Sequence, residues 1–173
     1  MSVCEIDDLN DEWVVHKLCH GDCYPTAIVL HEALGWPIGG FLVDWKERSW
    51  LPHLAHAYVI APDGRAFDAS GFRSMDAIHA RFMNSREGSE SRNPRYVEYG
   101  DIDSFRRALR PLYMGAAPDE SHPFHDPDFD PEERTRYDDE LDDMIPSIRY
   151  AAIGRLDLAG KAKEQFPDLV LAA

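Results

Sequence analysis

The sequence predicts a single domain of the α+β class, in which a central N-terminal helix packs on a small antiparallel sheet and further helices come from the C-terminal half. An apolar helical run near the N-terminus, strand-like runs separated by turn residues, and helical stretches near the C-terminus support this class. The 173 residues, 44% of them hydrophobic, are enough to bury one core without disulfide or metal staples. We therefore treat residues 1–173 as one domain.

The first predicted helix spans residues 23–34. Its apolar residues recur at helical spacing in a mostly apolar surround, which favours a buried central helix. These residues are Ala27, Ile28, Leu30 and Leu34. Asp22 is a good N-cap, Pro25 is tolerated in the first turn, and Gly35 supplies a C-terminal stop. Both ends of the helix are therefore marked.

Three strands are predicted next, over residues 38–45, 54–61 and 65–69. The second and third strands are joined by the segment 62–64 (Pro-Asp-Gly), where proline pre-sets the turn and glycine takes the left-handed position. A three-residue hairpin loop of this kind is a type I turn followed by a left-handed residue. The two strands should therefore form an antiparallel hairpin.

The rest of the chain alternates between helix, strand and loop. The predicted elements are a helix from Ser74 to Met83, a polar loop over 85–94, a strand over 95–99, a helix that begins at Asp101 or Asp103 and ends at Leu109, an irregular acidic loop over 115–131, and C-terminal helices over 132–165 that are divided between Met144 and Pro146. No internal repeat is visible in the sequence.

The formal charge of −14 argues against a protein that binds the phosphate backbone of nucleic acid, because such a protein needs clustered lysine and arginine. Much of the negative charge lies between Asp119 and Asp143. A solvated surface is the ordinary explanation of such a stretch. The alternative function is a non-catalytic acidic binding or inhibitor protein, of phage or mobile-element type, that captures a basic partner or imitates nucleic acid.

No run of residues is long enough to span a membrane, and the acidic N-terminus lacks the basic start and apolar core of a secretory signal. Three cysteines are an odd and small number for a secreted disulfide scaffold. We therefore expect reduced thiols, a cytoplasmic protein and no membrane partner. No feature of the sequence indicates an oligomeric state.

A cysteine stands at the start of the first predicted helix, within the segment 20–25 (HGDCYP). Because the N–H groups of the first turn and the positive end of the helix dipole face it, the thiolate form of Cys23 is favoured. The thiolate is the nucleophile in thiol chemistry, so Cys23 is a candidate nucleophile. The alternative is that Cys23 is a small buried apolar residue, the commonest fate of a free cysteine.

Thiol catalysis also needs a base and a group that orients it, and His56 and Asp68 fit these roles. Both lie within apolar, strand-like runs, where an ionisable side chain is costly unless it has a partner. With a three-residue loop, Tyr58 faces Asp68 and His56 faces Ser70. His56 and Asp68 then share one face of the hairpin as diagonal neighbours within reach of a hydrogen bond. A two-residue loop would put them on opposite faces.

Together, Cys23, His56 and Asp68 predict a cysteine hydrolase or acyl transferase that acts on an amide, peptide, isopeptide or glutamine side chain. The Cys23 thiolate would attack an acyl carbonyl, His56 would protonate the leaving group, and Asp68 would hold the imidazole tautomer. The Cys23 N–H would be one oxyanion donor. Candidate substrate-binding residues are Asp22, Tyr24, Trp36 and Tyr58, although core packing is the more frequent use of the aromatic ones. The expected partner is a peptide, protein or small amide substrate.

This arrangement resembles the papain-like cysteine enzymes, which include the NlpC/P60 amidases and the transglutaminase-like proteins. An Asp22-Cys23 pair at a helix start, followed by Gly35, Pro37 and then His56 on a strand, is similar to the NlpC/P60 layout. The order histidine, strand, turn, strand, aspartate is closer to the transglutaminase-like pattern. The resemblance implies a papain-like core and a Cys-His-Asp triad.

The resemblance covers residues 19–71, the expected catalytic core. The sequence departs from the NlpC/P60 pattern where Tyr24-Pro25 replaces a small serine–glycine pair, and Lys17 and Leu18 stand where papain-type enzymes carry a glutamine. A degenerate member of the fold, which keeps the hairpin for packing alone, is a further alternative.

No metal or cofactor is expected. The cysteines and histidines of segment 16–23 could surround zinc, but no second Cys/His pair has the spacing that a structural site needs. The segment 31–35 (HEALG) falls short of the zincin motif because a glycine occupies its last position. The segment 126–130 copies the opening of a calcium loop but is followed by proline where glycine is required.

Overall fold

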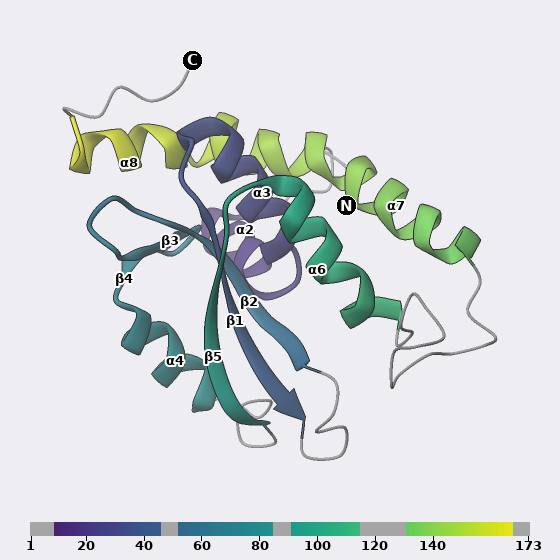
Figure 1. The fold of residues 1–173 in the computed structure, drawn as a ribbon. Coiled ribbons are helices and arrows are strands. Elements are labelled where there is room, and N and C mark those ends of the chain that lie inside the picture. The colour runs from purple at the N-terminus through teal and green to yellow at the C-terminus, as the bar shows by residue number, and fades with distance from the viewer. Residues whose placement is uncertain (1–8, 46–51, 85–90, 115–130, 168–173) are drawn as a thin grey trace.

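A computed structural model describes residues 9–45, 52–84, 91–114 and 131–167 of the chain (Figure 1). These residues form a five-stranded antiparallel sheet with the strand order β4-β3-β2-β1-β5. The strands are β1 (Ile38–Trp45), β2 (Pro52–Ile60), β3 (Ala66–Asp68), β4 (Gly71–Arg73) and β5 (Ser91–Tyr99). The helices are α2 (Asp11–His20), α3 (Cys23–Leu34), α4 (Met75–Met83), α6 (Ile102–Met114), α7 (Pro131–Arg149), the π-helix η1 (Tyr150–Arg155) and α8 (Leu158–Gln165). The predicted α+β class is confirmed.

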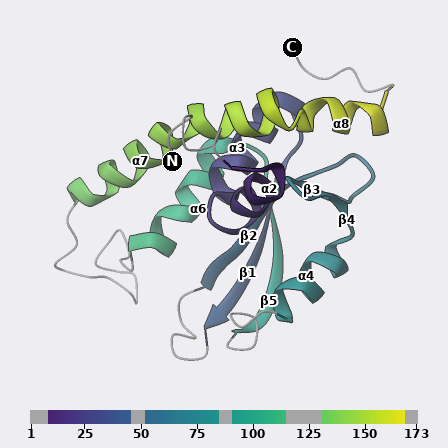
Figure 2. The same ribbon diagram turned by 180° about the vertical axis from the view of Figure 1, so that it is seen from behind.

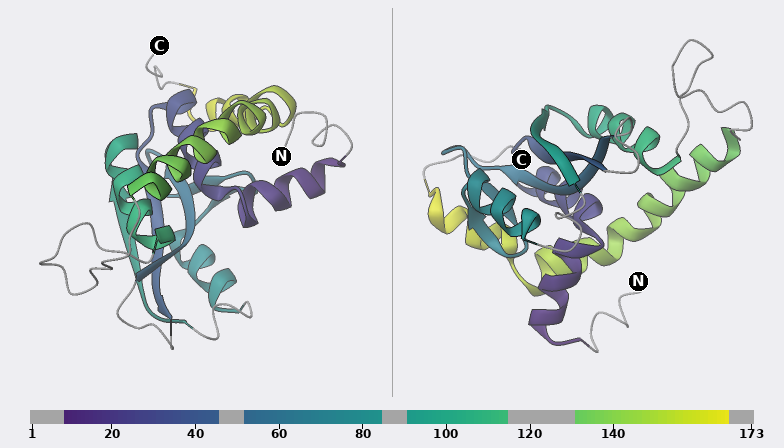
Figure 3. Two further views of the ribbon diagram at one scale, coloured as in Figure 1. Left: turned by 90° about the vertical axis from the view of Figure 1, so that its right-hand side faces the viewer. Right: turned by 90° about the horizontal axis from the view of Figure 1, so that it is seen from below.

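Helices cover both faces of the sheet, which Figure 3 shows edge-on between α6 and α4. Ala57 packs with α3 and α6, whereas its neighbour Tyr58 packs with Ile78 of α4. This is the expected outcome of strand geometry, since successive side chains point to opposite faces. Helix α2 lies on the same side as α4, as the view from behind shows (Figure 2).

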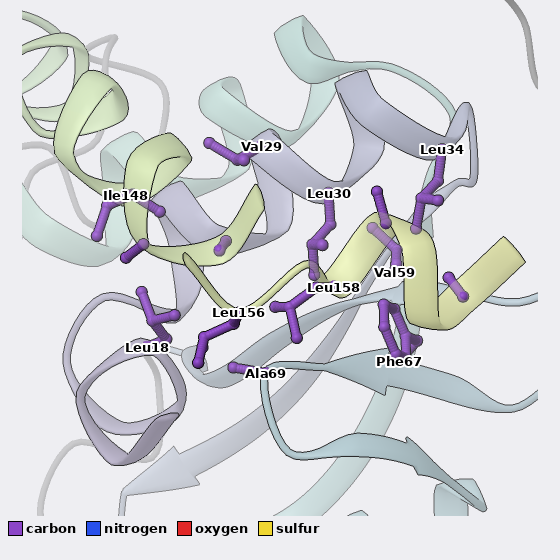
Figure 4. Packing of buried hydrophobic residues seen from close by; sticks show 14 of the residues in the cluster. Leu18, Val29, Leu30, Leu34, Val59, Phe67, Ala69, Ile148, Leu156 and Leu158 are labelled. Atoms are coloured by element: carbon purple, nitrogen blue, oxygen red, sulfur yellow. The ribbon is translucent and has the colours of Figure 1, made fainter. Parts of the chain in front are cut away.

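The largest apolar cluster encloses α3 between the β2–β3 hairpin and the C-terminal helices (Figure 4). It includes Leu18, Val29, Leu30, Leu34, Val59, Phe67, Ile148, Leu156 and Leu158, each no more than 6% exposed. Burial of each large apolar side chain in such a cluster stabilises the fold by about 1.5–3 kcal/mol. The expectation of a buried central helix is therefore confirmed, and this helix carries Cys23.

The hairpin register is the one that the turn residues predict. The Ala61 N–H donates to the Arg65 carbonyl at 2.8 Å, the Gly64 N–H donates to the Ala61 carbonyl at 2.8 Å, and Gly64 has φ of +83°. Cα pairing of Val59 with Phe67 continues this register. His56 and Asp68 therefore lie on one face, as expected.

The N-terminal helix α2 was absent from the predicted elements. Asn10 caps it by accepting a hydrogen bond from the Trp13 N–H at 2.9 Å, and Val14 and Leu18 are its buried residues. The Asn10 cap and the spacing of four between these two residues are a helix signal that is present in the sequence. Because α2 ends at His20, it brings the chain to the start of α3.

Asp22 occupies the N-cap position of α3, as predicted, but its side chain makes no capping hydrogen bond. Its carboxylate instead faces Lys17, with 3.4 Å between Nζ and Oδ2. The Asp22 backbone carbonyl accepts hydrogen bonds from the N–H and hydroxyl of Thr26, at 3.0 Å and 2.7 Å. The other end of α3 is as predicted, because Gly35 is left-handed, with φ of +68°.

The C-terminal helices differ from the prediction at Pro146. Helix α7 continues through this proline and runs directly into η1, so a division between Met144 and Pro146 is wrong. The direction changes instead at Asp157, which has φ of +47° and caps α8 by accepting from the Gly160 N–H at 3.1 Å. A proline inside a helix removes one helical hydrogen bond, which is why a boundary is predicted there.

The shorter predicted helices fit the structure at their starts, but α6 continues to Met114, five residues beyond the predicted end at Leu109. Ser74 caps α4 through the Ala77 N–H at 3.2 Å, and Asp101 rather than Asp103 accepts from the Ser104 N–H at the start of α6, at 2.7 Å. Strand β5 begins four residues earlier than expected, and β4 was not expected. Most of the predicted loops at 85–94 and 115–131 lies outside the described residues. No helix in the described part of the chain is long and apolar enough to cross a membrane.

Candidate active site

Cys23 is the first residue of α3, immediately after the corner that joins α2 to α3. The first N–H groups of a helix have no partner within the helix, and the Cys23 N–H belongs to this turn. The next residue, Tyr24, donates its hydroxyl hydrogen to the carbonyl of Leu54 in β2. This bond ties the start of α3 to the strand that carries His56, two residues beyond Leu54.

The three predicted catalytic side chains lie together. His56 Nε2 donates to Asp68 Oδ2 at 2.8 Å, and the Cys23 side chain lies close enough to the imidazole to raise its pKa. Since Nε2 is used by Asp68, Nδ1 is the ring nitrogen that remains for exchange of a proton with a thiol. The imidazole therefore stands between the thiol and the carboxylate, the order that acid–base assistance of a thiol requires.

Access to β2 explains how a helix can reach this histidine. Strand β3 pairs with β2 only at Val59 and Ile60, and it ends at Asp68. At His56, therefore, the edge of β2 that faces β3 is no longer paired with that strand, and the start of α3 lies beside this edge. The His56 side chain is 13% exposed, Cys23 is 7% exposed and Asp68 is 4% exposed. The exposed fraction therefore decreases from His56 to Cys23 to Asp68.

The charges of the site favour a protonated imidazole. Burial by itself lowers the pKa of His56, but hydrogen bonding to Asp68 and Cys23 and the negative charges of both groups outweigh it and raise the pKa to about 9. Burial raises the pKa of Asp68, whereas the hydrogen bond and charge of His56, with further hydrogen bonds from Ser70, bring it below its ordinary value. At neutral pH the pair is an imidazolium beside a carboxylate.

Ser70 and Arg73 extend this chain of hydrogen bonds, and sequence reasoning gave neither of them a role in the site. The backbone N–H of Ser70 donates to Asp68 Oδ1 at 2.7 Å, and its hydroxyl donates to the same oxygen at 2.5 Å. Arg73 Nε donates to Ser70 Oγ at 2.9 Å. An aspartate that bonds to the backbone two residues on is a common turn motif, so the segment 68–70 (Asp-Ala-Ser) carried a usable signal.

A second thiol close to the site, Cys19, differs from Cys23. It is 3% exposed, and burial together with the negative charge of Asp68 raises its pKa to about 12. A thiol with that pKa is neutral at physiological pH and is a poor nucleophile. Cys19 is therefore not a candidate nucleophile at neutral pH.

The predicted substrate-binding residues have different surroundings. Asp22 is 4% exposed and adjoins Cys23, and its Oδ2 accepts no hydrogen bond from the described residues. Tyr24 is 7% exposed and is committed to Leu54, with its ring edge-on to Phe105 at 6.4 Å. These contacts give Tyr24 a structural role.

Trp36 does not lie beside Cys23. It follows the far end of α3, about 18 Å along a helix of 12 residues, and is edge-on to Phe67 and Phe166 at 6.0 Å and 5.5 Å between ring centroids. Tyr58 does lie beside His56, with 6.0 Å between ring centroids, but it is only 1% exposed. It therefore supports the imidazole from inside the fold.

The described residues hold no group of three or more histidine, cysteine, aspartate or glutamate side chains placed to bind a metal ion. The segment 126–130, which copies the start of a calcium loop, lies outside the described residues, as do residues 119–130 of the acidic stretch between Asp119 and Asp143. In the described part of α7, Asp142 pairs with Arg106 while Asp139, Glu140 and Asp143 are exposed to solvent.

Comparison with known proteins adds no relative: no family model, no curated protein and no solved structure matches this chain.

Proposed function

We propose that the protein is a cysteine hydrolase or acyl transferase that uses Cys23 as nucleophile, His56 as acid and base, and Asp68 as the group that orients His56. The proposal includes the resemblance of residues 19–71 to the papain-like enzymes. The observation that carries it is the 2.8 Å hydrogen bond from His56 to Asp68, together with the position of Cys23 near enough to His56 to raise its pKa. Three side chains from α3, β2 and β3, far apart in the sequence, meet in the order that the reaction needs.

The reaction proceeds in two steps. The Cys23 sulfur attacks the carbonyl carbon of an amide, the S–C bond forms, and the C–N bond breaks as His56 gives its proton to the departing amine. Water or an amine then attacks the thioester, His56 takes its proton, and the Cys23 thiolate leaves. The Cys23 N–H lies in the first turn of α3, where it serves the oxyanion.

The raised pKa of His56 supports this assignment because it keeps the imidazole charged at neutral pH. A neighbouring imidazolium stabilises the thiolate, which is the reactive form. Asp68 holds the charged ring in place, and Ser70 and Arg73 hold Asp68. Each member of the chain therefore favours the ion pair between Cys23 and His56.

The test is alkylation by iodoacetamide at pH 6, with the modified cysteine identified by peptide mass spectrometry. We expect Cys23 to react at least tenfold faster than glutathione, because a free thiol of ordinary pKa is about 1% or less ionised at that pH. The variant His56→Gln should lose this excess. Cys19 in the same molecule is the internal control and should remain unmodified.

Acyl transfer is tested in the same samples with p-nitrophenyl acetate as the probe. Wild-type protein should release one equivalent of p-nitrophenol quickly and carry an acetyl group on Cys23, whereas Cys23→Ser and His56→Gln should not. A Cys23 that reacts with iodoacetamide no faster than glutathione, or equally fast in His56→Gln, would refute the proposed function.

A further inference from the structure

A row of exposed ring side chains follows α2 toward the candidate active site. Trp13, His16 and His20 are spaced by three and four residues, so they share one face of the helix. The ring centroids of Trp13 and His16 are 5.7 Å apart, and those of His16 and His20 are 4.6 Å apart. At the end of the row, Arg81 of α4 donates through Nη2 to His20 Nε2 at 2.7 Å.

Arg81 differs from several described arginines in what it faces. Arg65, Arg95 and Arg149 each pair with a carboxylate, at 2.5–2.9 Å. No carboxylate among the described residues pairs with Arg81, and its hydrogen-bond partner there is an imidazole. Because His20 Nε2 accepts from a guanidinium, this imidazole is neutral and does not offset the charge of Arg81.

The Arg81–His20 pair lies close to the candidate triad, because His20 is the last residue of α2 and only Gly21 and Asp22 separate it from Cys23. The charges of Asp68 and Arg81 both act on the Cys19 thiol, with opposite effects on its pKa. Burial is the main cause that lowers the pKa of His20, and the charges of Arg81, His16 and His56 lower it further. Arg81 and His20 therefore belong to the surroundings of His56 and Asp68, although they come from α4 and α2.

We propose that Arg81, oriented by His20, binds an anionic group of the substrate, so that the enzyme acts on amides that carry a carboxylate close to the scissile carbonyl. This inference rests on the proposed function of Cys23. A guanidinium presents five N–H donors in a planar fork, of which one is used by His20 and the others remain for a carboxylate. The general negative charge of the chain repels acidic substrates, so a cation at the end of α2, near the candidate site, favours binding of an acidic group there.

Two alkylating reagents that differ in charge test this directly. Iodoacetamide and iodoacetate react in the same way: the Cys23 sulfur forms a bond to the CH₂ carbon, the C–I bond breaks and iodide leaves. Iodoacetate alone carries a carboxylate. The measured quantity is the ratio of the rate constants for iodoacetate and iodoacetamide at Cys23, at pH 6 and low ionic strength.

We expect Arg81→Gln to lower this ratio about two- to fivefold, the size that one exposed charge pair supports. Arg81→Lys should retain most of the ratio, because it keeps the positive charge. Arg107→Gln is the matched control, since Arg107 is an exposed arginine of α6, and it should leave the ratio unchanged. Added salt to 1 M should remove the difference between wild type and Arg81→Gln.

The outcomes separate the two proposals. If Cys23 reacts fast with both reagents and Arg81→Gln leaves their ratio unchanged, the anionic subsite is refuted while the proposed function stands. If Cys23 reacts no faster than glutathione with iodoacetamide, the proposed function fails and the inference fails with it. A ratio that falls equally in Arg81→Gln and Arg107→Gln reflects net charge alone and also refutes the subsite.

Discussion

Replacing Asp68 by asparagine isolates the charge that holds His56 in its protonated state. The pKa of His56 is raised from 6.5 to about 9, which corresponds to roughly 3 kcal/mol in favour of the imidazolium. Asp68 supplies the largest of the raising contributions. A hydrogen bond between charged groups is worth about 1.5–3 kcal/mol, so Asp68→Asn should lower the pKa of His56 by about 1 to 2. Titration of the imidazole by NMR measures this directly.

The same substitution predicts a pH-dependent loss of stability. A histidine whose pKa is raised in the folded state stabilises the fold fully below pH 6.5, and this contribution is lost as the pH rises through about 9. At pH 6, Asp68→Asn should cost about 2–3 kcal/mol, somewhat below the usual value for a broken buried pair because the His56 side chain is 13% exposed. At pH 10, where His56 is neutral, the cost should fall to about 1 kcal/mol.

Urea denaturation of wild type and variant at both pH values gives these free energies of unfolding. Asp44→Asn is the matched control, because Asp44 is a buried aspartate that pairs with Arg95 at 2.9 Å. Arginine stays charged throughout this range, so the cost of Asp44→Asn should be the same at pH 6 and pH 10. An equal cost of Asp68→Asn at both pH values, or a His56 that titrates as in wild type, would contradict the reasoning.

Two further substitutions test the support of the site. Ser70→Ala removes a hydroxyl that donates to Asp68, so it should cost about 0.5–1.5 kcal/mol of stability and raise the pKa of Asp68, which moves acid unfolding to higher pH. Ser70→Thr should restore both the stability and the pKa. An unchanged midpoint of acid unfolding in Ser70→Ala would show that the hydroxyl does not hold Asp68. Gly39→Ala would place a Cβ 2.2 Å from Tyr58 Cε2, beside His56, and should cost about 1–3 kcal/mol and slow alkylation of Cys23. Gly100→Ala is its control, because no atom lies within 4 Å of the added Cβ, and equal effects of the two would refute the packing argument.

The parts of the site that the sequence predicted depend on local signals. The segment 62–64 determines the length of the hairpin loop. The loop length determines on which face of the sheet each side chain of the hairpin lies, because side chains alternate strictly along a strand. The sequence alone therefore predicts that His56 and Asp68 lie together. Cys23 was located by the start of a helix whose end at Gly35 was equally clear.

The remaining features depend on contacts between distant segments. The Asp22 side chain was expected to cap α3, but the Lys17 ammonium at the end of α2 competes for it. The sequence predicts that Pro146 divides a helix, but α7 continues through this proline and runs into η1. Arg81 and His20 meet across 61 positions of sequence. No local pattern encodes such a pairing.

The bond from Tyr24 to Leu54 couples the chemistry to the integrity of the whole molecule. Tyr24, the residue after Cys23, joins α3 to β2 through its hydroxyl group. These two elements carry the proposed nucleophile and the proposed base. The Cys23 sulfur and the His56 imidazole stay close to each other as long as this hydrogen bond and the apolar contacts around it persist. Heating should consequently abolish reactivity in the same transition that melts the domain, with no inactive yet folded stage before it.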